Sequence, residues 1–179
     1  FYYITLMNEN YAQPDLPANV AEGVIRGCYK FKTVQATNGS SGSWVSLLSS
    51  GAIMTEALKA ADILAHEGIH VDVFSVTSWS ELSRDGKLKE QANLSGQTGV
   101  GLPFISEVLA QGRGPIIAAT DYVHALPESI RAYIPDNRRY ITLGTDGFGR
   151  SDTRAALREY FGVDAASIVK AAKNAVKVA

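Results

Sequence analysis

The chain has 179 residues, of which 46% are hydrophobic and 20% are charged, and its formal net charge is −1. This composition is typical of a soluble globular protein, and the length fits one domain of ordinary size. The balanced charge disfavours nucleic acid or an anionic membrane as a partner, and the lack of an apolar run of about 18 residues argues against a membrane span.

The chemistry-bearing residues Cys and His are scarce. Cys28 is the single cysteine, which rules out an internal disulfide, and the three histidines are too scattered for the usual zinc-ligand spacings. We therefore expect a reducing, cytoplasmic setting and no metal site. Because no histidine lies near Cys28 in the sequence, we expect a buried, unreactive thiol there.

The first part of the chain combines apolar stretches with turn-forming residues. The opening "FYYITLMNENY" (1–11) is typical of the end of a buried strand followed by a polar turn, which indicates a piece of a longer protein. Residues 18–29 form a short helix or turn in this interpretation, and residues 30–36 form a strand. The segment "TNGSSGS" (37–43) is rich in Gly and Ser and predicts a hairpin-like connection to the next strand.

The next segment pairs a strand with a strongly patterned helix. Residues 44–51 predict the strand, and residues 52–68 predict an amphipathic helix that ends at Gly68. The predicted buried face of this helix consists of Ile53, Ala57, Ala61 and Leu64.

Strands and helices alternate through the rest of the chain. The further strands are predicted at 70–78, 115–122 and 139–145. The further helices are predicted at 80–91, within 99–114, at 126–135 starting from Pro127, at 151–162, and at 164–179 with Asp164 as its cap.

This order predicts the fold class. Strands that are separated by helices imply a mainly parallel sheet with helices on both faces. The first strand would be the antiparallel exception. The sequence therefore predicts a three-layer α/β fold with a mixed, mainly parallel five-stranded sheet.

Polar residues follow several of the predicted strands. Ligands of open parallel sheets bind beyond the carboxyl ends of the strands, so a shared binding site is one interpretation. The alternative is that these side chains only cap the turns and helices that follow. The residues are Thr77 and Ser78, Thr120 and Asp121, and Thr145 and Asp146.

The stretch "LGTDGFGRSD" (143–152) contains three glycines between a strand and a helix. Its spacing fits neither the dinucleotide fingerprint nor the P-loop. Arg150 beside the helix start would attract an anion, whereas Asp146 and Asp152 would oppose one. The alternative is a structural turn in which Ser151 caps the helix, Asp152 complements the helix dipole and Arg150 pairs with a carboxylate.

Candidate catalytic sets are sparse. His124 follows a strand, and with Asp121 and a serine it would suit a hydrolase, but the nucleophile-elbow pattern G-x-S-x-G is absent. An exposed loop residue or a partner contact is the alternative for His124. We assign no catalytic, cofactor-binding or metal-ligating residue. The weak candidates for an interface or anion site are Thr120, Asp121, His124, Asp146, Arg150 and Asp152.

Five stretches carry a resemblance to a known family. They are "YYITLMNENYAQP", "LLSSGAIMTEALKAADIL", "VDVFSVTSWSELSRDG", "ATDYVHALPESIRAYIP" and "YITLGTDGFGRSDTRAALREYFGVD". Together they resemble the transketolase C-terminal-like domain of the homodimeric, thiamine-diphosphate-dependent pyruvate dehydrogenase component of bacterial 2-oxo acid dehydrogenase complexes. The resemblance covers nearly the whole chain, and residues 87–101 depart from it in composition.

The resemblance implies a division of the chain and a role for it. Residues 1–20 would be the end of a preceding domain and a linker, and residues 21–179 the C-terminal domain, a structural and dimer-contact module. The full-length enzyme would decarboxylate pyruvate on thiamine diphosphate and magnesium, and then acetylate a lipoyl group of the dihydrolipoyl acetyltransferase. The expected partners are the rest of the polypeptide, a second subunit and that acetyltransferase.

The family's cofactor lies between the other two domains of opposing subunits, and its G-D-G-x-N-N signature is not found in this sequence. We therefore expect this fragment alone to bind no cofactor and to be inactive. A second hypothesis is an anion- or regulator-binding module that uses the strand ends near Asp121 and Asp146.

Overall fold

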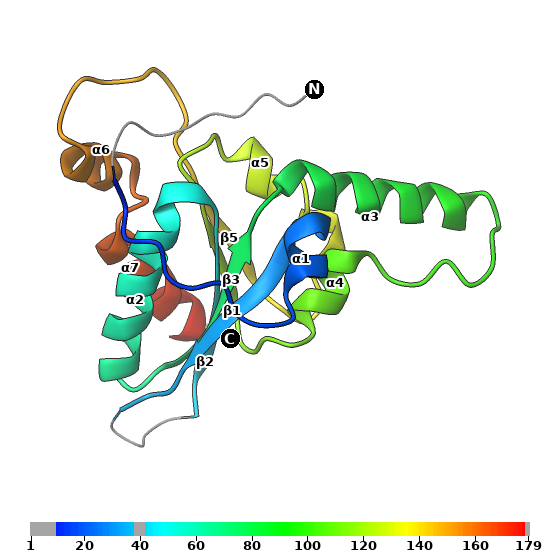
Figure 1. Ribbon diagram of the computed structural model, residues 1–179, viewed down its shortest axis with the longest axis horizontal. Coiled ribbons are helices and arrows are strands. Elements are labelled where there is room, and N and C mark those ends of the chain that lie inside the picture. Colours follow the sequence, from blue (N-terminus) through cyan, green and yellow to red (C-terminus); the bar gives the residue numbers. More distant parts are fainter. Residues whose placement is uncertain (1–9, 38–41, 178–179) are drawn as a thin grey trace.

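The computed structural model describes residues 10–37 and 42–177 as a five-stranded sheet between two layers of helices (Figure 1). The sheet order is β1-β3-β2-β4-β5, with β1 antiparallel to β3 and the other pairs parallel. The predicted fold class is therefore confirmed. The strand predicted in "FYYITLMNENY" falls almost entirely on residues 1–9, outside the described part. The five strands are β1 (Cys28–Val34), β2 (Trp44–Ser49), β3 (His70–Val76), β4 (Ile116–Ala119) and β5 (Tyr140–Leu143).

The predicted hairpin between β1 and β2 is wrong. β1 pairs with β3, Cys28 opposite Val76, while β2 lies between β3 and β4. The burial of the strands explains this order. β2 is buried over almost its full length and needs a neighbour on each side, whereas much of β1 is partly exposed, as suits an edge strand.

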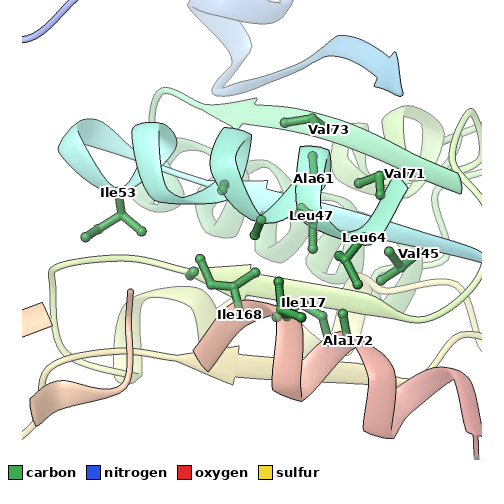
Figure 2. Close-up of a cluster of buried hydrophobic side chains, with 14 of the residues drawn as sticks. Val45, Leu47, Ile53, Ala61, Leu64, Val71, Val73, Ile117, Ile168 and Ala172 are labelled. Atoms are coloured by element: carbon green, nitrogen blue, oxygen red, sulfur yellow. The ribbon is translucent and has the colours of Figure 1, made fainter. Parts of the chain in front are cut away.

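One face of the sheet carries the predicted amphipathic helix. A 3₁₀ turn, η1 (Gly51–Ile53), leads into α2 (Met54–His66), which packs with α7 (Ala165–Lys177), and α6 (Arg154–Phe161) lies nearby. Figure 2 shows the resulting apolar cluster between α2, α7 and the sheet. The whole predicted face of α2 is buried, and Gly68 follows the helix with φ +87°. As predicted, Asp164 caps α7, because its Oδ1 accepts the backbone N–H of Ser167 at 3.1 Å.

The other face is covered by shorter helices and one long one. They are α1 (Ala21–Arg26), α3 (Trp79–Leu94), α4 (Phe104–Leu109), α5 (Ala125–Glu128) and the 3₁₀ turn η2 (Arg131–Tyr133). Apolar side chains of α3, α4, α5 and η2 form one cluster with Leu48 and Phe74 of the sheet. Cys28 belongs to this cluster, and burial raises the pKa of its thiol. A buried thiol is therefore confirmed, and the raised pKa makes it a poor nucleophile.

Three helix predictions need correction. α3 extends at both ends beyond the predicted 80–91, with Ser78 as its N-cap. The helix within 99–114 is only α4, because Gly99 and Gly101 have positive φ and Pro103 precedes the first turn. Residues 126–135 break into α5 and η2. Within the described chain, no helix has both the length and the apolar character that crossing a membrane requires.

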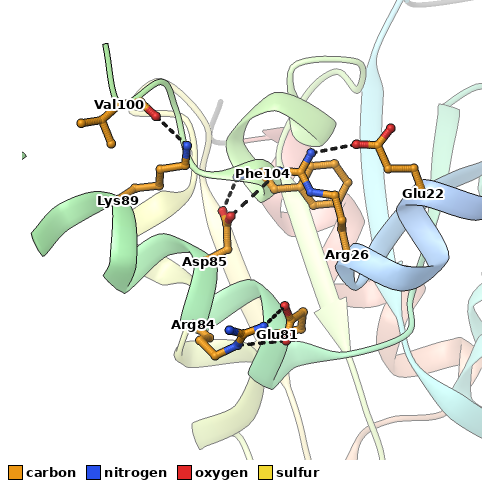
Figure 3. A network of polar contacts seen from close by, with 8 residues as sticks. All are labelled: Glu22, Arg26, Glu81, Arg84, Asp85, Lys89, Val100 and Phe104. Carbon is orange, nitrogen blue, oxygen red and sulfur yellow. Dashed lines mark hydrogen bonds and ion pairs between the residues drawn. The ribbon is translucent and has the colours of Figure 1, made fainter. Parts of the chain in front are cut away.

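A polar network fastens α1, α3 and α4 together (Figure 3). Asp85 accepts the backbone N–H of Phe104 at 2.7 Å, which satisfies the start of α4. The Arg26 guanidinium lies 3.8 Å from the centroid of the Phe104 ring and pairs with Glu22 at 3.0 Å. Lys89 donates to the Val100 carbonyl at 2.5 Å. The residues after α3 are thus held against that helix.

Candidate functional site at the carboxyl edge of the sheet

The carboxyl ends of the parallel strands β3, β2, β4 and β5 meet at one edge of the sheet. After β2 the chain continues through α2 to β3 on one side of β2, and β4 is added on the opposite side. The crevice between β2 and β4 is therefore a topological switch point, the place where α/β sheets most often bind ligands.

Thr120 and Ser50 lie at this switch point, and their hydroxyls satisfy each other. The two oxygens are 2.8 Å apart, and both residues are buried. Trp79 Nε1 donates to Ser50 Oγ at 3.1 Å, and the Tyr122 backbone N–H donates to Thr120 Oγ1 at 3.2 Å. Thr120 is therefore used to join the strand ends. The predictions from sequence did not assign a role to Trp79.

The loops after β4 and β5 are tied together by the other predicted residues. Thr145 Oγ1 donates to the Asp121 carbonyl at 2.7 Å. Asp146 Oδ2 lies 3.0 Å from His124 Nδ1, and its Oδ1 accepts the His124 backbone N–H at 2.9 Å. The structure thus brings together Asp121, His124, Thr145 and Asp146, as predicted for neighbouring strand ends.

Gly144, the first glycine of the stretch 143–152, is required because the loops after β4 and β5 approach each other closely here. A Cβ on Gly144 would lie 2.8 Å from the His124 backbone nitrogen and 2.9 Å from the Tyr122 carbonyl oxygen. Only glycine lets the end of β5 approach the neighbouring loop so closely. Gly147 has φ +93°, a backbone conformation that glycine adopts far more readily than other residues.

Thr77 and Ser78 have different roles. Ser78 Oγ accepts the Glu81 backbone N–H at 3.1 Å as the N-cap of α3, so local capping is confirmed for Ser78. Thr77 Oγ1 instead donates to the Val24 carbonyl at 2.7 Å and joins the end of β3 to α1.

Two details predicted for the loop before α6 are wrong. The N-cap is Thr153, whose backbone is extended (φ −63°, ψ 152°) and whose Oγ1 accepts the Ala156 N–H at 3.3 Å, so Ser151 lies outside the helix. Arg150 does not pair with a carboxylate in the described part of the chain. Its guanidinium lies 4.0 Å from the centroid of the Tyr160 ring instead.

Two cavities border this edge. The larger, about 850 Å³, lies at the ends of β2 and β3 and is lined by apolar side chains and hydroxyls, Met54, Trp79 and Ser50 among them. The smaller, about 330 Å³, lies between Asp121 and α6 and is lined by Arg150, Arg154 and Arg158. The predictions from sequence missed Arg154 and Arg158, although the spacing of four residues on a helix was a usable signal.

The geometry gives no support to a hydrolase. In the part of the chain that the structure describes, no serine hydroxyl bonds to His124, whose Nδ1 is taken by Asp146. The described residues also hold no group of three His, Cys, Asp or Glu side chains that suits a metal ion. His66 is on α2 and His70 on β3, on either side of Gly68.

The chain matches the family model described as "Transketolase-like TK C-terminal domain" over residues 27–164. Similar curated proteins include the "Pyruvate dehydrogenase E1 component" of Mycobacterium tuberculosis, 46% identical over 98% of this chain and 19% of the relative. That of Haemophilus influenzae is 47% identical over 96% of this chain and 19% of the relative. The chain thus spans about a fifth of the length of these relatives.

Solved structures agree on the fold. A transketolase from Campylobacter jejuni superposes with a TM-score of 0.57 at 19% identity, covering 89% of this chain and 20% of that one. A transketolase from Leishmania mexicana gives a TM-score of 0.55 at 22% identity, covering 88% and 19%.

Proposed function

Because the chain belongs to the family of transketolase-like C-terminal domains, we propose that it forms the C-terminal domain of a pyruvate dehydrogenase E1 component. The full-length enzyme would decarboxylate pyruvate with thiamine diphosphate and magnesium and acetylate a lipoyl group of its acetyltransferase partner. Residues 21–179 would be the domain, and residues 1–20 the end of the preceding domain and its linker. The cytoplasm is the expected compartment.

The carboxyl edge of the sheet fits thiamine diphosphate with magnesium poorly, because its polar groups already have partners within the protein. Magnesium bound with a diphosphate takes one or two carboxylates, and the Asp146 carboxylate at this edge is bonded to His124. The hydroxyls at the switch point are bonded to protein groups. This chain therefore has a structural role in the proposed enzyme.

One observation carries this role: large apolar side chains stand exposed at the carboxyl edge. Phe148, at the glycine-rich loop after β5, is 95% exposed, and Tyr122 and Val123 in the loop after β4 are about half exposed. Exposed apolar groups that gather at one edge of a domain favour a protein contact. We assign this edge to contact with the rest of the same enzyme, whose relatives are about five times as long as this chain.

The test uses the full-length enzyme with Phe148→Ser. Leu94→Ser is the matched control, because Leu94 is the last residue of α3 and is also an exposed apolar side chain, at 83%. We expect Phe148→Ser to weaken subunit association in sedimentation and to lower lipoyl acetylation, and Leu94→Ser to change neither. If the two variants have the same effect on subunit association and lipoyl acetylation, this edge is not the contact with the rest of the enzyme.

The isolated chain gives a second test. We expect no pyruvate-dependent reduction of an artificial electron acceptor and no heat of thiamine diphosphate binding. Turnover or tight binding by the chain alone would overturn the structural role.

A second candidate is an anion- or regulator-binding module at the smaller cavity, favoured by the three arginines that line it. Arg158 is already paired with Glu56 and Arg150 lies on Tyr160, so this candidate ranks second. Titration with phosphate, pyruvate or acetyl-CoA should then shift the NMR signals of residues 120–122 and 144–152. If the signals of residues 120–122 and 144–152 do not shift, the chain is not an anion- or regulator-binding module.

A further inference from the structure

The segment 10–16 forms one wall of the larger cavity. Gln13, Pro14 and Leu16 line this cavity on one side, and Met54 and Trp79 line it from the domain. The segment has no helix or strand of its own. What holds it in place therefore decides how far the cavity of about 850 Å³ is covered.

A charge-assisted contact holds the segment at Tyr11. Arg158 Nη2 donates to the Tyr11 hydroxyl at 3.1 Å, and the guanidinium carbon lies 5.8 Å from the centroid of the Tyr11 ring. The Arg158 side chain is only 16% exposed, so solvent competes weakly for this bond.

Arg158 is itself fixed by a buried carboxylate. Its Nη1 donates to Glu56 Oε1 at 3.2 Å, and Glu56 Oε2 accepts the Ala165 backbone N–H at the start of α7 at 3.1 Å. The Glu56 side chain is 8% exposed. Lys59 approaches the same carboxylate from the solvent side at 2.9 Å and is 63% exposed. The guanidinium is therefore oriented by a contact that does not involve Tyr11.

We propose that residues 10–16 are a strap that covers one side of the larger cavity, and that Arg158, oriented by Glu56, fastens this strap through Tyr11. The inference goes beyond the proposed function, because it concerns how the segment that precedes the domain is held, whichever enzyme contains it. Release of Tyr11 opens the groove between α2 and the start of α3 without unfolding either helix.

Backbone order parameters of the 179-residue chain, measured by NMR relaxation, test the fastening. Tyr11→Phe keeps the ring and removes the hydroxyl, and Arg158→Gln removes the guanidinium. We expect the order parameters of residues 11–13, 15 and 16 to fall below about 0.6 in both variants, with the core strands unchanged. Lys59→Gln is the matched control, because it removes a partner of Glu56 that does not touch Tyr11, and it should leave these order parameters unchanged.

Quenching of Trp79 fluorescence tests whether the strap covers the cavity. Trp44 and Trp79 are the two tryptophans of the chain, so a Trp44→Phe background reports Trp79 alone, which is 4% exposed at the cavity. Tyr11→Phe should raise the acrylamide quenching constant at least twofold, and Lys59→Gln should not. The proposal is overturned if the order parameters of the strap are already below about 0.6 in the unaltered chain, if Tyr11→Phe changes neither readout, or if Lys59→Gln changes both equally.

Discussion

Asp146 holds His124 through two contacts at once: Oδ2 lies 3.0 Å from the imidazole Nδ1, and Oδ1 accepts the backbone N–H at 2.9 Å. The pair joins the loops that follow β4 and β5. Both side chains are open to solvent, 37% exposed for His124 and 63% for Asp146, so water and salt weaken the charged part of the contact.

Asp146→Ala should therefore loosen the edge of the sheet without unfolding the domain. We expect the free energy of unfolding to fall by about 1 kcal/mol or less, and the exchange of the His124 amide to rise. Urea unfolding and hydrogen exchange measure the two effects. Asp152→Ala is the control, because that carboxylate only accepts the N–H of the next residue and should leave the His124 amide unchanged. A loss above about 3 kcal/mol would contradict this account.

The ion pair between Glu128 and Arg131 predicts a pH dependence of stability. Hydrogen bonds from Arg131 lower the pKa of Glu128 from 4.5 to about 2, helped by a hydrogen bond from Thr142 on β5. A lowered pKa in the folded state stabilises the protein above pH 4.5, and this contribution is lost as the pH falls from 4.5 to about 2.

Glu128→Gln should reveal this contribution. The unaltered chain should be more stable than the variant by a constant amount above pH 5, and the difference should shrink towards pH 2 in urea unfolding. Glu107→Gln, at an exposed position on α4, serves as the control. Its difference in stability from the unaltered chain should not shrink as the pH falls towards 2. A difference between Glu128→Gln and the unaltered chain that stays constant down to pH 2 would contradict the assigned cause.

Arg138 joins elements at the opposite, amino edge of the sheet. It donates to the carbonyls of Leu109 at 2.7 Å, Arg113 at 2.9 Å and Gly114 at 2.6 Å, and to Ser46 Oγ at 2.6 Å. Burial lowers the pKa of its guanidinium to about 10, which leaves it charged at neutral pH.

Arg138→Ala should lower the free energy of unfolding by about 1–2 kcal/mol, because it removes the bonds to the buried residues Leu109 and Ser46, whereas the Arg113 and Gly114 carbonyls belong to exposed residues and can bond to water. Arg138→Lys should restore little, since one ammonium group cannot reach the four acceptors that the planar guanidinium reaches. Thermal and urea unfolding measure both losses. The neighbouring Arg139 is exposed, so Arg139→Ala should cost little. Full rescue by lysine would contradict the geometric explanation.

Gly86 on α3 marks a close contact with the Tyr133 ring. A Cβ there would lie 2.2 Å from Tyr133 Cε2, so Gly86→Ala must displace the ring. We expect a loss of about 1–3 kcal/mol, whereas in a Tyr133→Ala background the same change should become neutral or favourable, because alanine favours helix. A thermodynamic cycle of the four proteins measures this reversal. If Gly86→Ala lowers the free energy of unfolding equally in both backgrounds, the Tyr133 ring is not the cause of the loss.

Some of the structure was open to prediction because it depends on local pattern. The apolar spacing of Ile53, Ala57, Ala61 and Leu64 requires a helix with one buried face, whatever it packs against, and the structure confirms it. Asp164 likewise caps α7 through a bond within the first turn. The strand ends with Asp121 and Asp146 were predicted to meet because parallel strands bring their carboxyl ends to one edge.

Other features depend on partners that are distant in the chain. Ser151 and Thr153 are both good caps by residue type, and the choice between them depends on how the preceding loop is held, with Arg150 against Tyr160. The helix predicted from Pro127 breaks because Glu128 and Arg131 bond to Thr142 and to the Tyr140 carbonyl on β5. These partners are 9 and 14 residues apart, further than the three- and four-residue spacing by which a helix is recognised in the sequence.

The sequence by itself therefore determined the α/β class, the helix faces and the family of this chain, because periodicity and family motifs lie within short stretches. Only the tertiary structure decided that β1 joins β3 instead of β2, since burial of β2 needs neighbours on both sides. It alone also placed Tyr11 on Arg158 and Trp79 on Ser50, contacts that span 147 and 29 residues and exist only once the layers have packed.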